Sequence, residues 1–269
     1  MIKIIAEIGI NHNSSMILAK KLIDLAAIAG FNFVKFQKRD VDLCVPEHKK
    51  NETKSTPWGD MTYYEYKKRM EFNENDYVEI DKYCKTKAID WFASVWDLNS
   101  AEFMTQFCDI VKVPSALITD CELLEYCRNN FETMIISTGM STEEQVQKAM
   151  NYEPDVVMHT NSSYPANVDE LNLKYIEWLT DRYNCEIGYS GHEYGLNTTF
   201  ATVSMGVSWI ERHITLNHDM WGSDQKSSVD PVGCIKLVRG IRAIESSIGK
   251  YGPRKLLESE KKKLADLRK

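Results

Sequence analysis

Two histidines at the ends of two apolar segments could bind a metal ion, and a glutamate lies beside one of them. His192 directly follows GYSG, and Glu211 and His213 lie in the segment WIERHITL. Two imidazoles can share one divalent metal, with water or substrate completing its coordination. Side chains two residues apart in a strand point to the same face, so we expect Glu211 and His213 to share a site. Arg212 should then point the other way and pair with a carboxylate on a helix.

Two lysines and five serines form a second group, whose chemistry suits an oxyanion. The lysines are Lys35 and Lys112, and the serines are Ser94, Ser115, Ser137, Ser162 and Ser190. Ammonium groups and hydroxyls donate hydrogen bonds to phosphate and carboxylate oxygens, and the charge-assisted bonds are the strong ones. Because the net charge of the chain is −6, attraction for an anionic ligand must come from local donors of this kind.

Eight apolar segments position these residues. The segments expected as strands are residues 4–8, 33–37, 90–95, 109–114, 133–138, 155–160, 185–190 and 207–213. Each is followed by a segment expected as a helix, at residues 15–29, 75–87, 98–107, 120–128, 142–150, 169–182, 195–205 and 231–248. Eight strands alternating with eight helices over about 250 residues predict an α/β protein with a (β/α)8 TIM barrel. We place this single domain at residues 1–250 and expect residues 251–269 to form a charged helical tail.

This fold would bring the polar residues together. In a (β/α)8 barrel the carboxyl ends of all strands open on one mouth, where active sites lie. Every predicted strand ends in at least one polar residue, and Glu7, Gln37, His159 and Tyr164 join the two groups above. Such a set predicts one shared site. The alternative, an open doubly wound sheet, lacks the GxGxxG motif expected after its first strand.

Two long connections interrupt the alternation of strands and helices, at residues 38–71 and 217–230. The first is polar and carries a cluster of aromatic residues. Both connections leave the carboxyl end of a predicted strand, so we expect both at the mouth of the barrel. Long loops in that place are functional more often than not.

The composition argues against nucleic-acid or membrane partners. The acidic net charge, −6, gives no general attraction for nucleic acid or an anionic membrane. No apolar run reaches the roughly 20 residues that a bilayer requires, and the N-terminus becomes polar too early for a signal peptide. Seven cysteines without a CxxC pair are typical of free thiols in a reducing compartment, so we expect a cytoplasmic protein.

Eight motifs, in order along nearly the whole chain, resemble those of the sialic acid synthase family. They are AEIGINHN (6–13), VKFQK (34–38), MTYYEYKKRMEF (61–72), ISTGMST (136–142), SSYPA (162–166), IGYSGHEYG (187–195), IERHITL (210–216) and SDQKSSVDP (223–231). The resemblance implies a transferase that condenses phosphoenolpyruvate with an N-acetylmannosamine-like or related amino-sugar aldehyde. The products would be phosphate and a nine-carbon 2-keto acid: sialic acid, legionaminic acid or another nonulosonic acid. It also implies a divalent metal, with manganese ahead of magnesium or cobalt, and a homodimer.

The resemblance also assigns roles to individual residues. The residues that would bind phosphoenolpyruvate are Lys35, Ser94, Lys112, Ser115, Ser137, Ser162 and Ser190, and those that would hold the metal are His192 and His213. The catalytic group facing the open-chain sugar would be Glu7, Gln37, Tyr164, Glu211 and Asp224, of which Asp224 is assigned by the resemblance alone. The metal would make the aldehyde more electrophilic. The lysines would offset the charge of the departing phosphate, and Glu211 or Glu7 would orient or deprotonate the attacking water.

Three departures from the family pattern concern the sugar. The chain resembles a short form, because the family's C-terminal antifreeze-like domain does not follow Lys269. In the family, that domain supplies an arginine to the partner subunit's sugar site. Leu117 stands where many relatives place an acidic sugar contact, and Gln225 stands where relatives often have histidine. We therefore expect the phosphoenolpyruvate and metal chemistry to be retained and the choice of sugar to differ.

Three alternative functions remain. Another phosphoenolpyruvate-dependent synthase could make a 3-deoxy-2-keto acid from a phosphorylated sugar, but the polar strand ends offer no second phosphate site. A class I aldolase could use Lys35 or Lys112 for a Schiff base, which would leave His192 and His213 unexplained. A non-catalytic barrel that binds a ligand is the third alternative, and against it no expected metal or phosphate residue is missing.

Overall fold

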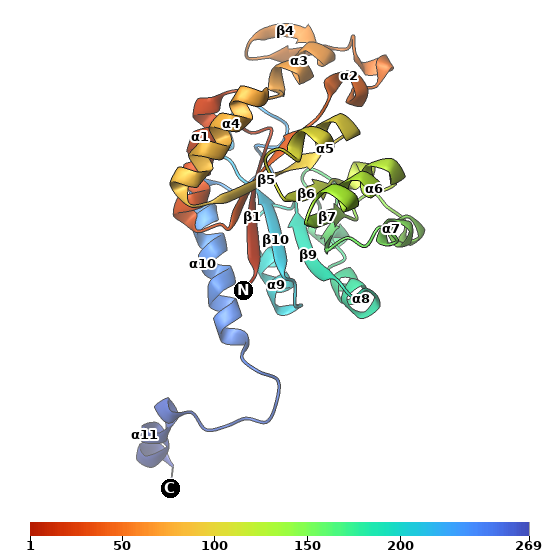
Figure 1. The fold of residues 1–269 in the computed structure, drawn as a ribbon. Coiled ribbons are helices and arrows are strands. Elements are labelled where there is room, and N and C mark those ends of the chain that lie inside the picture. The colour runs from red at the N-terminus through yellow and green to blue at the C-terminus, as the bar shows by residue number, and fades with distance from the viewer. Residues whose placement is uncertain (269) are drawn as a thin grey trace.

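Eight parallel strands close into one barrel (Figure 1). A computed structural model of the protein describes residues 1–268. Around the barrel the strands follow in the order β1-β10-β9-β8-β7-β6-β5-β2, and β2 pairs with β1 to close it. Their bounds are β1 Lys3–Gly9, β2 Phe33–Lys38, β5 Asp90–Val95, β6 Ile110–Val113, β7 Thr133–Ser137, β8 Val156–Thr160, β9 Glu186–Gly191 and β10 Trp209–His213. The predicted (β/α)8 fold is confirmed.

A helix follows each barrel strand. These helices are α1 Met16–Ala29, α4 Glu74–Lys87, α5 Leu98–Met104, α6 Cys121–Asn130, α7 Glu143–Met150, α8 Lys174–Arg182, α9 Asn197–Ser204 and α10 Pro231–Ile248. In α1, Leu22, Ile23 and Ala26 are buried on one face, which packs against the barrel. The Ser15 side chain caps this helix by accepting a hydrogen bond from a backbone N–H, and Gly30 ends it in the left-handed conformation.

The two long connections lie where the sequence predicts them, and the first has structure of its own. It contains α2 Val41–Cys44, the 3-10 helix η1 Glu47–Lys49, an antiparallel hairpin of β3 Thr53–Thr56 and β4 Gly59–Thr62, and α3 Tyr63–Met70. Shorter 3-10 helices are η2 Ser115–Leu117 and η3 Val168–Glu170. The two connections touch each other, because the Trp221 ring lies 5.6 Å from the Trp58 ring and 5.5 Å from the Tyr66 ring. They therefore share the same end of the barrel.

The apolar core fills the space between strands and helices, and polar residues fill part of the barrel interior. Every residue of β10 is buried. This is expected for the apolar Trp209 and Ile210, but the next three residues are ionisable. Buried charge is stable only with partners. The carboxyl half of the barrel must therefore supply those partners.

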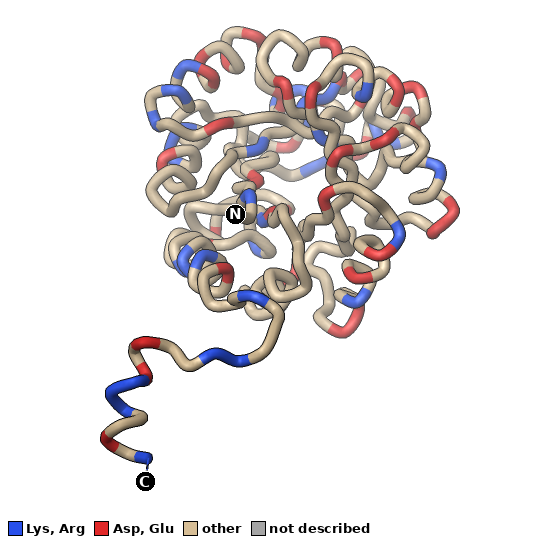
Figure 2. Tube along the Cα trace, turned by 60° about the horizontal axis from the view of Figure 1, so that its bottom comes forward, with Lys and Arg blue, Asp and Glu red and all other residues tan. Residues whose placement is uncertain are grey.

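The chain continues beyond α10 as α11 Glu258–Leu267, which extends away from the barrel (Figure 1). Over the outer surface, acidic and basic residues are interspersed (Figure 2). None of the helices in residues 1–268 is long and apolar enough to cross a membrane. All seven cysteines are free thiols, as predicted.

Candidate active site at the mouth of the barrel

The carboxyl ends of the strands surround a cavity of about 280 Å³. Of the 14 predicted site residues, 13 line it: Glu7, Lys35, Gln37, Ser94, Lys112, Ser115, Ser137, Ser162, Tyr164, Ser190, His192, Glu211 and His213. The remaining one, Asp224, lies beside it. Residues from all eight strands or from the turns that follow them thus converge as the fold predicts.

Two ammonium groups and two carboxylates alternate at the bottom of the cavity. Lys35 Nζ lies 2.7 Å from Glu7 Oε2 and 3.7 Å from Glu211 Oε1, and Lys112 Nζ lies 2.7 Å from Glu211 Oε1. All four side chains are at least 96% buried. Burial lowers the pKa of Lys112, which Glu211 partly offsets. Burial opposes ionisation of Glu211 as well, but Lys112 and Lys35 outweigh it and lower the pKa of Glu211 to about 2.

Hydroxyl groups complete a wall of donors around these charges. Ser94 Oγ accepts a hydrogen bond from Lys35 Nζ at 2.7 Å, and Ser190 Oγ donates to Glu211 Oε1 at 3.1 Å. The buried hydroxyl of Ser137 has no hydrogen-bond partner within residues 1–268. Because a buried polar group without a partner is costly, this hydroxyl is suited to a ligand atom in the cavity.

Gly139 lies between two other serines of the wall. Its backbone N–H donates to Ser115 Oγ at 3.1 Å. A side chain at this position would place its Cβ 2.1 Å from Ser162 Oγ and 2.8 Å from Ser115 Oγ. Only glycine therefore lets both hydroxyls approach the same backbone segment.

His192 and His213 form a pair whose arrangement fits a divalent metal. Their ring centroids lie 5.3 Å apart. His192 Nδ1 lies 2.7 Å from the carbonyl oxygen of Asn161, so Nδ1 carries the proton and Nε2 keeps its lone pair. Burial, and then His213, lower the pKa of His192 to about 3, which keeps this imidazole neutral as a metal requires. The buried Nδ1 of His213 has no hydrogen-bond partner in residues 1–268. The described residues contain no cluster of three or more His, Cys, Asp or Glu side chains that could hold a metal, so solvent or substrate would have to complete the coordination of an ion bound by the two histidines.

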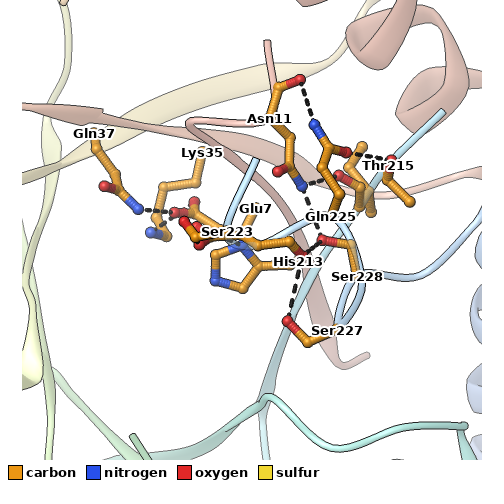
Figure 3. A network of polar contacts seen from close by, with 12 residues as sticks. Glu7, Asn11, Lys35, Gln37, His213, Thr215, Ser223, Gln225, Ser227 and Ser228 are labelled. Atoms are coloured by element: carbon orange, nitrogen blue, oxygen red, sulfur yellow. Dashed lines mark hydrogen bonds and ion pairs between the residues drawn. The ribbon is translucent and has the colours of Figure 1, made fainter. Parts of the chain in front are cut away.

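The connection after β10 approaches His213, with Ser223, Ser227 and Ser228 beside its ring (Figure 3), and it also carries Asp224. Asp224 Oδ2 lies 3.9 Å from His213 Nδ1, and Ser223 Oγ donates to Asp224 Oδ1 at 2.6 Å. The backbone of this connection is fixed through Asn11, whose Nδ2 donates to Ser228 Oγ at 2.8 Å; Ser228 Oγ in turn donates to the Asp224 carbonyl oxygen at 2.6 Å. The buried loop network thus holds Asp224 at the edge of the cavity.

Two residues predicted to alter the sugar half of the site do not reach the cavity. Gln225 is fully buried; it accepts a hydrogen bond from Thr215 and donates to the Asn11 carbonyl oxygen at 3.2 Å. Leu117 packs against the hydrophobic core. Neither side chain lines the cavity. These two departures therefore lie behind the cavity wall: Gln225 stabilises the connection after β10, and Leu117 packs against the core.

Arg212 points away from the cavity, as the alternation of β10 predicts. Its guanidinium Nη1 donates to Glu193 Oε1 at 3.1 Å, to Thr199 Oγ1 at 2.7 Å and to the Gly195 carbonyl oxygen at 2.9 Å. Glu193 belongs to the turn between β9 and α9, so the expected carboxylate partner exists but does not lie on a helix. The register assumed for Glu211 and His213 is confirmed.

One predicted strand-end residue is misplaced, and five residues of the cavity wall were not predicted: Trp96, Pro114, Ala116, Met140 and Thr160. His159 lies outside the barrel wall, where its Nε2 is 2.6 Å from the Leu171 carbonyl oxygen, because the inward positions of β8 are the even-numbered ones. Thr160, on the inward face, lines the cavity instead. Trp96 also lines it, and its buried indole Nε1–H has no partner within residues 1–268. Strict alternation identifies Thr160, whereas no sequence signal marks Trp96.

The mouth of the closed barrel holds paired lysines and glutamates beside two histidines. This arrangement is typical of one class of protein, the (β/α)8 enzymes that bind an anionic substrate. The sequence comparison is more specific. A profile of the NeuB family matches residues 22–252, so the chain belongs to the NeuB family. The resemblance to sialic acid synthases, the fold and the prediction of a phosphoenolpyruvate-dependent enzyme that forms carbon–carbon bonds are thereby confirmed.

Individual relatives show how far the similarity extends. The chain is 32% identical to N,N'-diacetyllegionaminic acid synthase of Campylobacter jejuni, over 99% of this chain and 83% of that protein. It is 35% identical to N-acetylneuraminate-9-phosphate synthase of Drosophila melanogaster, over 85% of this chain and 64% of that protein. Among solved structures, the N-acetylneuraminic acid synthetase of Leptospira borgpetersenii in complex with citrate superposes with a TM-score of 0.86 at 27% identity. The match covers 98% of this chain and 90% of that one.

Proposed function

We propose that residues 1–250 carry out the condensation of phosphoenolpyruvate with an amino-sugar aldehyde of the N-acetylmannosamine type. The products are a nine-carbon 2-keto acid, of the sialic or legionaminic acid kind, and phosphate. The alternating lysines and glutamates, facing the unpartnered Ser137 hydroxyl, are the observation that supports this best. The names of relatives, synthases of N,N'-diacetyllegionaminic acid and N-acetylneuraminate 9-phosphate, agree with it.

Phosphoenolpyruvate would bind in the cavity through seven residues: Lys35, Ser94, Lys112, Ser115, Ser137, Ser162 and Ser190. Without an anion, Lys35 and Lys112 are neutralised by Glu7 and Glu211. The phosphate and carboxylate groups of the substrate add negative charge, which the two ammonium groups and the surrounding hydroxyls stabilise. Their fixed positions also stabilise the phosphate charge as it departs.

The sugar would lie on the other side of the cavity, beside the histidine pair. Glu7, Gln37, Tyr164 and Asp224 would face its hydroxyl and amide groups. His192 and His213 would hold a divalent metal, for which we propose Mn²⁺, with Mg²⁺ or Co²⁺ as alternatives. When bound there, such an ion supplies Lewis acidity to the aldehyde oxygen.

The reaction would form one carbon–carbon bond and one bond from C2 to a water oxygen, and it would break the C2–O bond to phosphate. The methylene carbon of phosphoenolpyruvate would attack the aldehyde carbon, and water would add to the cationic C2; the proton that this water loses balances the one that the aldehyde oxygen takes up. The C2–O bond to phosphate would then break with its electron pair going to the phosphate, which takes up the proton that the C2 hydroxyl loses as the ketone forms. Because the pKa of Glu211 is about 2, its carboxylate keeps its charge and stabilises the cation at C2; it is a poor proton acceptor.

A phosphate-release assay tests the reaction. The protein is incubated with phosphoenolpyruvate, Mn²⁺ and a panel of mannosamine-type and bacillosamine-derived sugars, and the product is identified by mass spectrometry. We expect release of phosphate in step with formation of a nine-carbon 2-keto acid for at least one sugar. Absence of release across the whole panel would overturn the proposed reaction.

Calorimetric titration with Mn²⁺ tests the metal site. We expect His213→Ala to abolish binding, because it removes one of two imidazole ligands. His218→Ala is the control: His218 is an exposed histidine of the connection after β10 that contacts the Ser228 carbonyl oxygen but does not line the cavity, and this variant should bind as the wild type does. Equal affinity of both variants would remove the basis for a metal at the histidine pair.

We extend the proposal to a cytoplasmic homodimer. The free thiols, four of them buried, suit a reducing compartment. The family resemblance supports the dimer, which light scattering of the purified protein can test.

A further inference from the structure

Arg39, the first residue after β2, contacts the cavity wall without lining the cavity. Its side chain is 7% exposed and lines a separate pocket together with Lys68. The guanidinium Nη2 donates a hydrogen bond to Gln37 Oε1, and Gln37 does line the cavity. An influence of Arg39 on the site must therefore pass through another side chain, of which Gln37 is the one that it directly bonds.

The Arg39 guanidinium is itself held in one place. Its Nε lies 3.1 Å from Glu71 Oε1, and the Arg39 backbone N–H donates to Glu71 Oε2 at 3.2 Å. The face of the guanidinium lies over the Trp96 ring, 4.6 Å from the centroid. A planar group with a carboxylate at its edge and an aromatic ring on its face has little freedom to turn. Arg39 thus offers Gln37 a fixed donor.

Gln37 needs such a partner, because its backbone does not fix its amide. In the barrel Gln37 pairs with Ser94 of β5, and the Tyr77 hydroxyl donates to the Gln37 carbonyl oxygen at 3.1 Å. These contacts fix the main chain. The last torsion of a glutamine side chain is broad and roughly two-fold, so the oxygen and nitrogen ends of the amide can exchange places. Only hydrogen-bond partners select one orientation.

Arg39 and Glu7 select the same orientation of the Gln37 amide. A guanidinium can only donate, so it takes Oε1, and Nε2 then donates to Glu7 Oε1 at 2.9 Å (Figure 3). The opposite orientation would bring two donors together at Arg39 and two acceptors together at Glu7. The second N–H of Nε2 has no acceptor within residues 1–268. It is available to a ligand in the cavity.

We propose that Arg39 is a positioning residue for the second substrate: through Gln37 it presents an N–H donor, and not a carbonyl oxygen, to the amino sugar. The inference rests on the proposed function, in which Gln37 faces the sugar. The sugar atom that meets Gln37 must then be an acceptor, such as a hydroxyl oxygen or the carbonyl oxygen of an acyl group. Arg39 touches neither substrate and takes no part in bond making.

Hydrogen exchange of the Gln37 amide tests the positioning without turnover. The chain has only five glutamines, so selective ¹⁵N-glutamine labelling gives few side-chain signals, and Gln37→Met identifies that of Gln37. We expect Arg39→Met to speed exchange of this amide at least about tenfold, because one charge-assisted hydrogen bond is lost. Lys68→Met is the matched control: it removes a half-exposed cation from the same pocket, where Lys68 pairs with Asp42 at 3.0 Å, and should leave the exchange rate unchanged.

A second variant guards against misfolding. Arg39→Met leaves the Glu71 carboxylate, 13% exposed, without its cation. Arg39→Met/Glu71→Gln removes that charge as well, and its Gln37 amide should exchange as fast as in Arg39→Met. Thermal melting checks that each variant is folded.

Steady-state kinetics with a sugar that releases phosphate tests the role in the reaction. Arg39→Met and Gln37→Met should each lower kcat/KM for the sugar about tenfold, and the double variant should be at most about twofold worse than Gln37→Met. The KM for phosphoenolpyruvate should change less than about twofold, because Lys35 keeps its contacts with Ser94 and Glu211.

Three outcomes overturn the proposal: an unchanged exchange rate in both Arg39 variants, the same acceleration in Lys68→Met, or losses of kcat/KM that multiply in the double variant. The last would mean that Arg39 acts independently of Gln37. Absence of turnover with every sugar would refute the proposed function and with it the role of Arg39 toward the sugar. The exchange rates would still show whether Arg39 orients the amide, so the two failures are distinguishable.

Discussion

Replacement of Arg212 by methionine should destabilise the protein severely while leaving the proposed metal site in place. The Arg212 side chain is 1% exposed, and Glu193, its partner, is fully buried. Arg212→Met preserves much of the apolar volume but removes the only cation paired with Glu193 in residues 1–268. It also removes the donors to Thr199 Oγ1 and to the Gly195 carbonyl oxygen.

The size of the expected loss in the free energy of unfolding follows from the carboxylate of Glu193, which Arg212→Met leaves without a cation. Breaking a buried ion pair by removing one partner costs about 3–5 kcal/mol, because the remaining charge has neither water nor a counter-ion. We expect a loss of about 4 kcal/mol in the free energy of unfolding, out of a typical total of roughly 5–15 kcal/mol. Three hydroxyls, of Tyr189, Thr198 and Thr199, still donate to Glu193 and keep the loss from being larger.

Urea unfolding followed by far-UV circular dichroism measures this loss. The matched control is the double variant Arg212→Met/Glu193→Gln, in which no buried charge is left. It should lose at least about 1.5 kcal/mol less than the sum of the two single variants. A loss below about 1 kcal/mol for Arg212→Met would refute the argument, because such a value is typical of an exposed pair. Mn²⁺ binding by the folded variant should persist, since His213 lies on the opposite face of β10.

Two further predictions concern the cavity and the pH dependence of stability. Gly139→Ala should raise the KM for phosphoenolpyruvate about tenfold or more. The new Cβ would lie 2.1 Å from Ser162 Oγ and would displace this proposed phosphate ligand. An unchanged KM in steady-state kinetics would argue against Ser162 as a ligand. Burial, and then Arg39, lower the pKa of His12 to about 3, so below pH 6.5 the unfolded chain binds a proton that the folded chain does not. Lowering the pH from 7 to 5 should therefore reduce the free energy of unfolding by up to about 2 kcal/mol through this residue. In urea unfolding at both pH values, His12→Gln should show a smaller decrease in the free energy of unfolding than the wild type.

The barrel was predictable because its strands are buried on both faces. Such strands appear as short, continuous apolar runs, and all eight runs became strands within a few residues of their predicted bounds. The placement of the charged residues followed from two rules: strand ends share one mouth, and side chains two apart share one face. Those rules placed Glu211 and His213 inside and Arg212 outside without knowledge of any contact.

The errors and omissions arise where neither rule applies. His159 was assigned to the mouth by its place at a strand end, although its odd position in β8 turns it outward. Gln225 was interpreted by its type, but its side chain is fully used in hydrogen bonds with Thr215 and with the carbonyl oxygen of Asn11, after β1.

The two halves of the site therefore depend on different parts of the chain. The proposed phosphoenolpyruvate half is built mainly from strand residues, with Ser115 and Ser162 in the segments that follow β6 and β8. The strand positions are fixed by the hydrogen bonding of the barrel, so a change there disturbs the core as well. The proposed sugar half is bordered by the two long connections, which contact each other through Trp221. Since loops accept substitution more readily than packed strands, we expect the choice of sugar to change through residues of these connections while the charges of Lys35 and Lys112 stay balanced. Differences in sugar specificity within this family should accordingly map to the connections after β2 and β10.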